Sequence, residues 1–399
     1  MSNVHGALHG IRVIDLSAVV SGPFGTAMLA DQGADVITIE MCDSPDIIRS
    51  AGAIGEGTEG VSALWAAQNR NKRAIALNLK DERGKAVLLD LVKGADVVVQ
   101  NFRPGVVERM GLGYDVLSAV NPDIVMCSIS GFGSSGPYSH RPAFDPIIQS
   151  VAGYPVIQAD MDGTPRLVKT IVADKVTSLN VAQAVCAALV ARANGHGGQH
   201  VEVAMIDAAI HFLWLDGLWN YTYLDHDSTV PDLNLVYHLY RTKDGWAMVY
   251  PIAKPAHWHN ALEALGRLDL ETDPRFDQLH KRSANMAIIN AELSAEVAKY
   301  TTAEIVKIMD EADVPVSPVN TRLEMIEDAH VQHREIVVET VHPSAGRIRS
   351  ARSAALFSKT PSSLRRHAPR HGEHTDEVLA ELGRTPEEIA ELRAAGVIV

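Results

Sequence analysis

Cysteine is scarce in this chain, which has three in 399 residues: Cys42, Cys127 and Cys186. They lack CxxC spacing and are too few to form a disulfide framework. Each lies among apolar neighbours, so we expect buried thiols. A catalytic thiol is not expected, because no activating group lies beside any of them.

Long apolar runs are also missing, and none approaches the roughly 18–20 residues that a membrane span requires. Residues 1–10 lack the charged start and apolar stretch of a secretory signal. We therefore expect a cytoplasmic protein that does not bind membranes. The formal net charge of −13 disfavours a general nucleic-acid binder, which would be basic.

Several motifs of cofactor and metal chemistry are absent. The chain has no GxxxxGK[ST] loop, no HExxH and no paired CxxC, so we predict no metal site. Glu40 ends a predicted strand, where an acidic residue could bind a ribose hydroxyl. The first turn nevertheless reads SAVVSGPFG rather than GxGxxG, and its Pro23 lies where a helix should begin. A nicotinamide or flavin enzyme is therefore disfavoured.

Alternating strands and helices dominate the first part of the chain. Val- and Ile-rich segments are separated by helical patterns such as 82–92, with a small-residue turn at 21–25 and a helix at 26–32. The predicted strands are 10–16, 34–40, 74–79, 95–100 and 123–130. This pattern predicts an α/β fold with a parallel sheet that is covered on both faces.

The pattern changes beyond these strands. An amphipathic helix is expected at 174–194, then a strand at 200–205 and a Trp-rich helix from 207. From about 225 the sequence predicts a smaller α+β unit. Its expected elements are a hairpin over 239–252, helices at 256–266, 285–299 and 302–312, and an extended segment at 314–318. Strands around 335–357 and a helix at 374–384 complete the chain.

Six segments, read together, resemble one family, the class III CoA-transferases. This family contains the formyl-CoA and carnitine CoA-transferases and also the 2-methylacyl-CoA racemases. The segments occur in the family's order and span nearly the whole chain. They are VIDLSAVVSGPFGTAMLADQGADVITIE (13–40), NRNKRAIALNLKDERGK (69–85), QNFRPGVVERMGLGYDVL (100–117), ISGFGSSGPYSHRPAFD (129–145), ADKVTSLNVAQAVCAALVARANGHGGQHVEVAM (173–205) and GEHTDEVLAELG (372–383).

The resemblance implies a fold that periodicity cannot supply. It implies a large Rossmann-like CoA-binding domain, with a parallel sheet formed by both chain ends, and a smaller α+β domain. Residues 1–224 and 329–399 would form the large domain, and 225–328 the small one. Two chains would interlock as a homodimer.

Asp174 matches the family's catalytic aspartate. From the residues alone, an Asp directly before an amphipathic helix is a good N-cap. The two roles are compatible, because a helix N-terminus favours an ionised carboxylate and a nucleophile must be ionised. The resemblance implies that Asp174 attacks the thioester carbonyl, giving a mixed anhydride and a CoA thiolate. The thiolate then attacks the aspartyl carbonyl or the anhydride, and an acceptor carboxylate takes over the other group.

The resemblance also implies a set of CoA contacts. No permanently bound cofactor is expected, since CoA and acyl-CoA are substrates and a small carboxylic acid is the partner. Cationic members can pair with phosphate, and apolar members can flank the adenine. The implied contacts are Val19, Leu77, Lys80, Asn101, Arg103, Arg109 and Met110.

Three departures separate this chain from the formyl-CoA enzymes. Val20 replaces a Gln, Phe144 replaces a Tyr, and the region 229–239 lacks a run of four glycines. That glycine loop shields reaction intermediates in the formyl-CoA enzymes, so its absence argues against strict oxalate and formate specificity.

Two alternative functions remain. A racemase needs a base on each face of the α-carbon, but its AGHD motif is here Pro142–Asp145, with Phe144 in place of the histidine. His140 could take a shifted role. A non-catalytic acyl-CoA-binding subunit would keep Asp174 as a cap only.

Arg141 could bind a substrate carboxylate, which would suggest a dicarboxylic acid, or form a structural ion pair.

Overall fold

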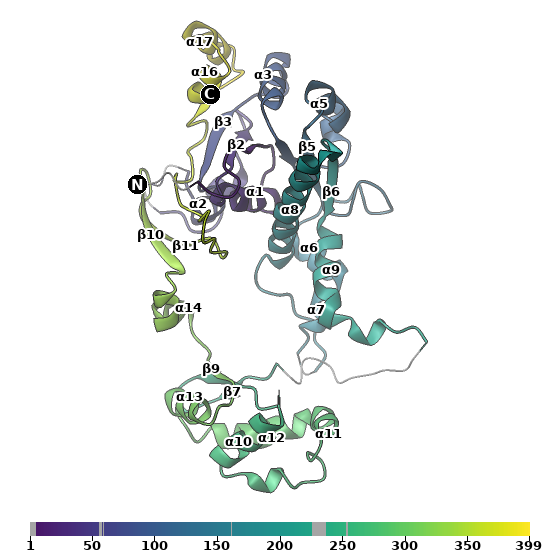
Figure 1. Ribbon diagram of the computed structural model, residues 1–399, viewed down its shortest axis with the longest axis vertical. Coiled ribbons are helices and arrows are strands. Elements are labelled where there is room, and N and C mark those ends of the chain that lie inside the picture. Colours follow the sequence, from purple (N-terminus) through teal and green to yellow (C-terminus); the bar gives the residue numbers. More distant parts are fainter. Residues whose placement is uncertain (1–4, 56–57, 59, 161, 226–236, 253) are drawn as a thin grey trace. The chain divides into compact units, whose positions relative to one another are not determined.

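A computed structural model describes residues 5–55, 58, 60–160, 162–225, 237–252 and 254–399. One compact unit contains a six-stranded parallel sheet in the order β3-β2-β1-β4-β5-β6, several strands of which are labelled in Figure 1. The strands are β1 Arg12–Asp15, β2 Asp35–Glu40, β3 Lys72–Ala76, β4 Val97–Gln100, β5 Val125–Ser130 and β6 His200–Ala204. This is the doubly wound order: successive strands are added toward one edge from β1 to β3 and toward the other edge from β4 to β6. The predicted α/β parallel sheet is confirmed.

Both faces of the sheet are covered, because neighbouring strand residues point to opposite sides. Ile14 belongs to a core beneath α3 (Glu82–Lys93) and α5 (Tyr114–Val120). Val13 belongs to a second core beneath α1 (Ser21–Asp31) and α8 (Val172–Ala191). The near-continuous Val and Ile composition of the strands follows from this double burial.

Helix α1 begins earlier than the sequence suggested. The residues predicted to form a small-residue turn, 21–25, are its first turn, and Pro23 is its third residue. Proline is tolerated there because the first N–H groups of a helix have no intrahelical acceptor. The presence of Pro23 therefore does not argue against a helix that begins at this turn.

Helix α8 continues through a short π-type turn, Arg192–His196. Among the described residues, Val172–His196 is the one helix long and apolar enough to cross a membrane by length and composition. Its position is that of a core helix, since Val181 and Val185 are fully buried in the core shared with α1.

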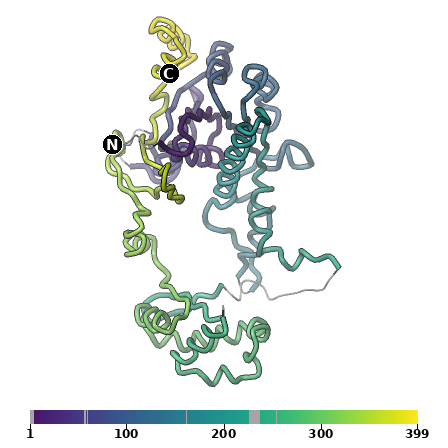
Figure 2. Tube along the Cα trace, in the orientation of Figure 1, coloured from purple at the N-terminus to yellow at the C-terminus, as the bar shows by residue number. Residues whose placement is uncertain are grey.

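The C-terminal residues 332–399 belong to the same compact unit as the sheet. They contribute a separate antiparallel pair, β10 (Val337–His342) with β11 (Gly346–Ala351), and helices α16 (Thr375–Glu381) and α17 (Pro386–Ala394). Figure 2 shows this segment, in yellow, returning beside the strands of the N-terminal part.

The prediction that both chain ends form the parallel sheet is wrong for the described residues. All six strands lie between residues 12 and 204, and the C-terminus adds one isolated antiparallel bridge from Ile398 to Leu77. The strands predicted around 335–357 are β10 and β11, and their backbone groups are bonded to each other in a separate antiparallel pair.

A second compact unit comprises residues 154–166 and 213–331, whereas the sequence placed the small domain at 225–328. The predicted hairpin is confirmed as β7 (Tyr240–Arg241) with β8 (Trp246–Val249), and β9 (Val316–Pro318) joins it. Helices pack against a core around Trp258 and Phe276. They are α10 Pro255–Ala264, α11 Leu279–Ala284, α12 Met286–Val297 and α13 Thr302–Glu311. Most of the expected linker and of the glycine-run position falls at 226–236, outside the described residues.

Candidate active site

A cavity of about 370 Å³ opens in the first unit at the carboxyl ends of the parallel strands. The residues that follow β1, β2, β4 and β5 line it, including Ser17, Met41, Asn101 and Gly131. Ligands of open α/β sheets bind at this edge, where the strand order reverses. Asp174 lies in the cavity wall, as a residue of α8.

Asp174 does not cap its helix. Helix α8 begins at Val172, so Asp174 is its third residue, and the N-cap position is Ile171. The Asp174 side chain is buried at 8% exposure, and within the described residues its carboxylate accepts no hydrogen bond. The expectation of an N-cap is therefore wrong, and the carboxylate is left available to a ligand.

A second carboxylate lies beside Asp174. Asp145, the first residue of α6 (Asp145–Ala152), accepts a hydrogen bond from the Asp174 backbone N–H at 3.1 Å. Gln149, one turn further along α6, donates to the other Asp145 oxygen at 2.6 Å. Asp145 ends the segment Pro142–Asp145, and no local feature of the sequence indicates its contact with Asp174.

This environment changes the acidity of Asp174. Burial, and then the charge of Asp145, raise the pKa of Asp174 from its ordinary 3.8 to about 7. The sequence had suggested that the helix N-terminus keeps this carboxylate ionised, and that expectation fails because burial dominates. A carboxylate with little solvation becomes a stronger nucleophile once it is ionised.

The turn after β1 is held in an unusual conformation. Val19 has a positive φ of 69°, which costs a β-branched residue about 1–3 kcal/mol. Asn101 bonds both polar groups of Ala18, accepting from its N–H at 2.9 Å and donating to its carbonyl at 2.6 Å. Asp46 accepts the Val19 N–H at 2.9 Å, and Gln68 donates to the Val19 carbonyl. Side chains from three other segments thus hold this turn against the cavity.

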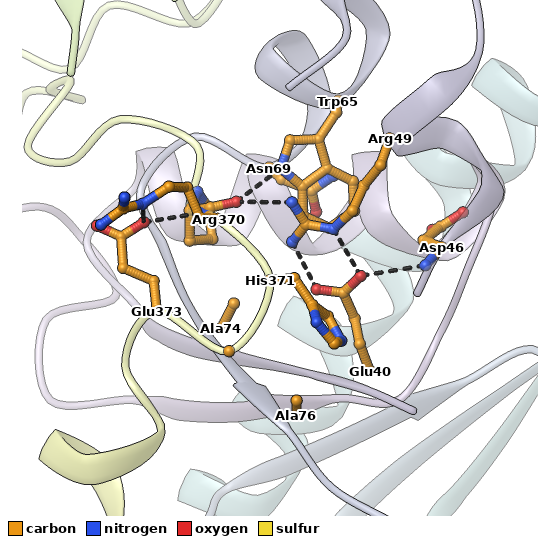
Figure 3. Close-up of polar contacts among 12 residues, drawn as sticks. Glu40, Asp46, Arg49, Trp65, Asn69, Ala74, Ala76, Arg370, His371 and Glu373 are labelled. Atoms are coloured by element: carbon orange, nitrogen blue, oxygen red, sulfur yellow. Dashed lines mark hydrogen bonds and ion pairs between the residues drawn. The ribbon is translucent and has the colours of Figure 1, made fainter. Parts of the chain in front are cut away.

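Glu40 does not offer a free carboxylate for a ribose. Arg49 donates to both of its oxygens, at 2.8 and 2.6 Å, and the guanidinium lies 3.7 Å from the centre of the Trp65 ring (Figure 3). Arg49 and the Trp65 indole also donate to the Pro369 carbonyl of the C-terminal segment. The paired Glu40 is therefore part of the cavity wall.

A fully buried ion pair stabilises the wall of the cavity near α1. The Lys72 ammonium donates to Asp15 at 3.0 Å, to the Pro23 carbonyl at 2.8 Å and to Asn69 at 2.8 Å. Asp15 also accepts from the Thr26 hydroxyl at 2.5 Å. The Asn69 amide lines the cavity and its Nδ2 has no partner among the described residues. Sequence reasoning missed this network, because its members come from separate segments.

The predicted CoA residues divide into two groups. Val19, Asn101 and Arg103 line the cavity together with Asp174. The other four are not among its lining residues. Leu77 is fully buried in the core, and Met110 is partly buried against it. Lys80 and Arg109 are exposed, and the Lys80 Nζ lies 3.9 Å from a carboxylate oxygen of Asp43.

The departures from the formyl-CoA pattern also have defined places. Phe144 lines the cavity and is 61% exposed, whereas Val20 is buried. His140 is exposed and is not among the lining residues.

Of the cysteines, Cys127 is fully buried, and burial raises its pKa to about 12, while Cys42 and Cys186 are partly buried. No cysteine lines the cavity.

Comparison with known proteins identifies the family of this chain. The family model for CoA-transferase family III matches residues 8–375. A succinate–glutarate CoA-transferase of Agrobacterium fabrum is 32% identical over 96% of this chain and 97% of that protein. A formyl-CoA:oxalate CoA-transferase of Streptomyces avermitilis is 34% identical over 98% of this chain and 99% of that protein.

A solved structure of a CAIB/BAIF family protein from Brucella suis is also similar. The two structures align with a TM-score of 0.81 and 28% sequence identity, and the alignment covers 95% of this chain and 100% of the Brucella protein. The chain described here belongs to CoA-transferase family III. The resemblance and the enzyme class predicted from the sequence are thereby confirmed.

Proposed function

We propose that this enzyme moves CoA from an acyl-CoA thioester to a carboxylic acid, with Asp174 as the covalent nucleophile. The observation that carries the proposal is the Asp174 carboxylate, which is buried in a cavity wall without a hydrogen-bond partner among the described residues. A structural aspartate at such a site would be expected to accept hydrogen bonds.

The proposed reaction begins when ionised Asp174 attacks the thioester carbonyl. The carbon–sulfur bond breaks, CoA leaves as a thiolate, and an acyl–aspartyl anhydride forms. The thiolate then attacks the aspartyl carbonyl, which releases the donor acid and leaves an aspartyl–CoA thioester. The acceptor carboxylate attacks this thioester and again expels the thiolate. Attack of the thiolate on the acceptor carbonyl forms the new acyl-CoA and restores Asp174.

Two features of the site support these reaction steps. The cavity holds the nucleophile away from water, which strengthens its charge interactions. Ser21 of α1 also lines the cavity, and no side chain caps the N-terminus of this helix. The backbone N–H groups of Ser21 and Gly22, which precede Pro23, are therefore proposed to stabilise the oxyanion that forms at each step.

CoA is proposed to enter the cavity past Val19, Asn101 and Arg103, which line it. Lys80 and Arg109 are exposed cations, as phosphate partners must be, and remain proposed contacts. The named relatives transfer CoA among succinate, glutarate, formate and oxalate, so small carboxylic acids are the proposed partners.

The cytoplasmic location and the interlocked homodimer remain predictions, and light scattering at several concentrations would test the dimer.

Hydroxylamine trapping tests the covalent role of Asp174. The purified protein is incubated with a panel of acyl-CoAs and hydroxylamine, and modified peptides are mapped by mass spectrometry. We expect a hydroxamate on Asp174, because an aspartyl anhydride or thioester is attacked by this amine. The matched control is Asp207, the third residue of α9 (Met205–Gly217), which is exposed and should stay unmodified.

Two results would contradict the proposal. One is an unmodified Asp174 under conditions in which the protein catalyses CoA transfer. The other is exchange of the substrate α-proton with solvent deuterium in the absence of transfer, which would indicate a racemase. Asp174→Asn should abolish both hydroxamate formation and transfer, while Asp207→Asn should retain both.

A further inference from the structure

Arg141 lies in the same cavity as Asp174, on a segment that is packed closely against the sheet edge. The segment 139–144 contributes Arg141 and Phe144 to the cavity wall. Gly131, directly after β5, allows its approach, because a Cβ at Gly131 would stand 2.1 Å from the Cβ of Ala143. Asp145 follows the segment and bonds the Asp174 N–H. The contacts of Ala143 and Asp145 therefore constrain the segment on the C-terminal side of Arg141.

The guanidinium of Arg141 has no carboxylate partner among the described residues. It stacks on the ring of Tyr138, with 3.8 Å between the guanidinium carbon and the ring centre. Tyr138 in turn packs edge-on against Phe132, with 5.6 Å between ring centres. Stacking occupies the faces of a guanidinium but leaves its in-plane N–H groups free for a bidentate carboxylate. The alternative of a structural ion pair is thus not realised in this part of the chain.

Other charges of the cavity are already engaged. Glu40 is bonded to Arg49, and Asp46 accepts the N–H groups of Val19 and Ile48. Arg103, the other arginine of the cavity wall, is the one proposed for CoA. Arg141 is therefore the cation left for an anionic group that a substrate brings.

We propose that Arg141 is a specificity-determining residue that binds the second carboxylate of a dicarboxylic acid. The first carboxyl, free or as the thioester, then lies at Asp174. This inference rests on the proposed function and narrows its acids to dicarboxylic ones. A monocarboxylic acid of the same length would leave the guanidinium unpaired and would lose the orientation that two attached ends provide.

Matched acids test the proposal. CoA transfer is measured for wild-type protein and for Arg141→Gln and Arg141→Lys. The acceptors are succinate, glutarate and adipate, each paired with butyrate, pentanoate or hexanoate of equal chain length. Arg347→Gln serves as the control, since Arg347 is exposed on β11 and pairs with Glu339. Thermal unfolding verifies that every variant is folded.

We expect Arg141→Gln to lower kcat/KM for the best dicarboxylic acid by about 10- to 100-fold, since a charge-assisted pair is lost. The loss should fall mainly on KM, because the second carboxylate is bound alike before and during reaction. Monocarboxylic acids should change by less than about threefold. Arg141→Lys should lie between the two, because it keeps the charge but loses the planar fork.

Three results would overturn the role of Arg141. They are a wild-type preference for monocarboxylic acids, an unchanged preference for dicarboxylic acids in Arg141→Gln, and an equal loss for both classes, which would mark a CoA contact. An absence of transfer with every acid would instead defeat the proposed function. Calorimetric titration of glutarate into wild-type and Arg141→Gln protein, each saturated with CoA, would then decide the matter, and equal affinity would reject the inference.

Discussion

Asp174 and Asp207 occupy the same position, the third residue, in helices α8 and α9. Local sequence therefore describes them alike, and both suit the positive end of a helix dipole. Their environments differ, since Asp174 is buried beside Asp145 and Asp207 is exposed. At the scale of single residues, burial is what separates a candidate nucleophile from an ordinary helix-terminal aspartate.

Replacing Asp174 by Asn should stabilise the fold in a pH-dependent way. The pKa of Asp174 is raised to about 7, so the folded state resists an ionisation that in the unfolded chain has its midpoint near pH 4. The cost is absent below about pH 4, grows between pH 4 and 7, and is complete above pH 7. Above pH 7 we expect Asp174→Asn to be more stable than wild type by roughly 2–4 kcal/mol.

Urea unfolding at several pH values measures this difference. Asp207→Asn is the control, and its effect should stay within about 0.5 kcal/mol because the side chain is exposed. An Asp174→Asn variant that is less stable than wild type at pH 8, or equally shifted at all pH values, would show that ionised Asp174 is not destabilising.

At the scale of elements, the contact between the end of β5 and the segment 139–144 shapes the cavity. Gly131 follows β5, and the space for its absent side chain is filled by the methyl group of Ala143. The same segment leads into α6, whose Asp145 bonds the first turn of α8. A strand, a loop and two helices are therefore coupled through contacts only a few ångströms long.

Gly131→Ala should displace this segment and lower kcat/KM by at least about tenfold, because small misplacements of catalytic groups are costly. The added methyl would stand 2.1 Å from that of Ala143, far inside van der Waals contact. The double variant Gly131→Ala, Ala143→Gly removes the clash and should recover part of the activity. Steady-state kinetics of both variants provides the measurement, and a fully active single variant would refute the coupling.

At the scale of the whole molecule, the chain forms two compact units with separate cores. The cavity is lined by residues of the first unit. Leu262 is fully buried in the core of the second unit, and Leu88 in a core of the first. These leucines allow a matched test of whether CoA binding depends on the first unit alone.

Leu262→Ala should destabilise the second unit by about 2–5 kcal/mol yet leave the Kd for CoA within about twofold. Leu88→Ala removes the same side chain from the first unit and should weaken CoA binding as that unit becomes less stable. Scanning calorimetry follows unfolding, and isothermal titration follows CoA. Equal losses of CoA affinity in both variants would show that binding requires the second unit.

The sequence by itself determined the alternation of strands and helices, the hairpin at 240–249 and the family. These depend on side-chain periodicity and on the order of local segments, which a linear chain displays directly. It also singled out Asp174, and it identified Val19, Asn101 and Arg103, which line the cavity. It misplaced the start of α1, because a proline is compatible with either a turn or the first turn of a helix. The resemblance to the family, and no local pattern, implied that the C-terminus joins the sheet, which the described strands do not bear out.

Only the tertiary structure decided the electrostatics of the site. Asp145 precedes Asp174 by 29 residues, and Lys72 follows its partner Asp15 by 57. Arg141 could be judged free of a carboxylate partner in the described chain only once its neighbours in space were known. Acidity and charge pairing depend on which groups come into contact in the folded chain and on how much water remains around them. The order of residues along the chain determines neither of these directly.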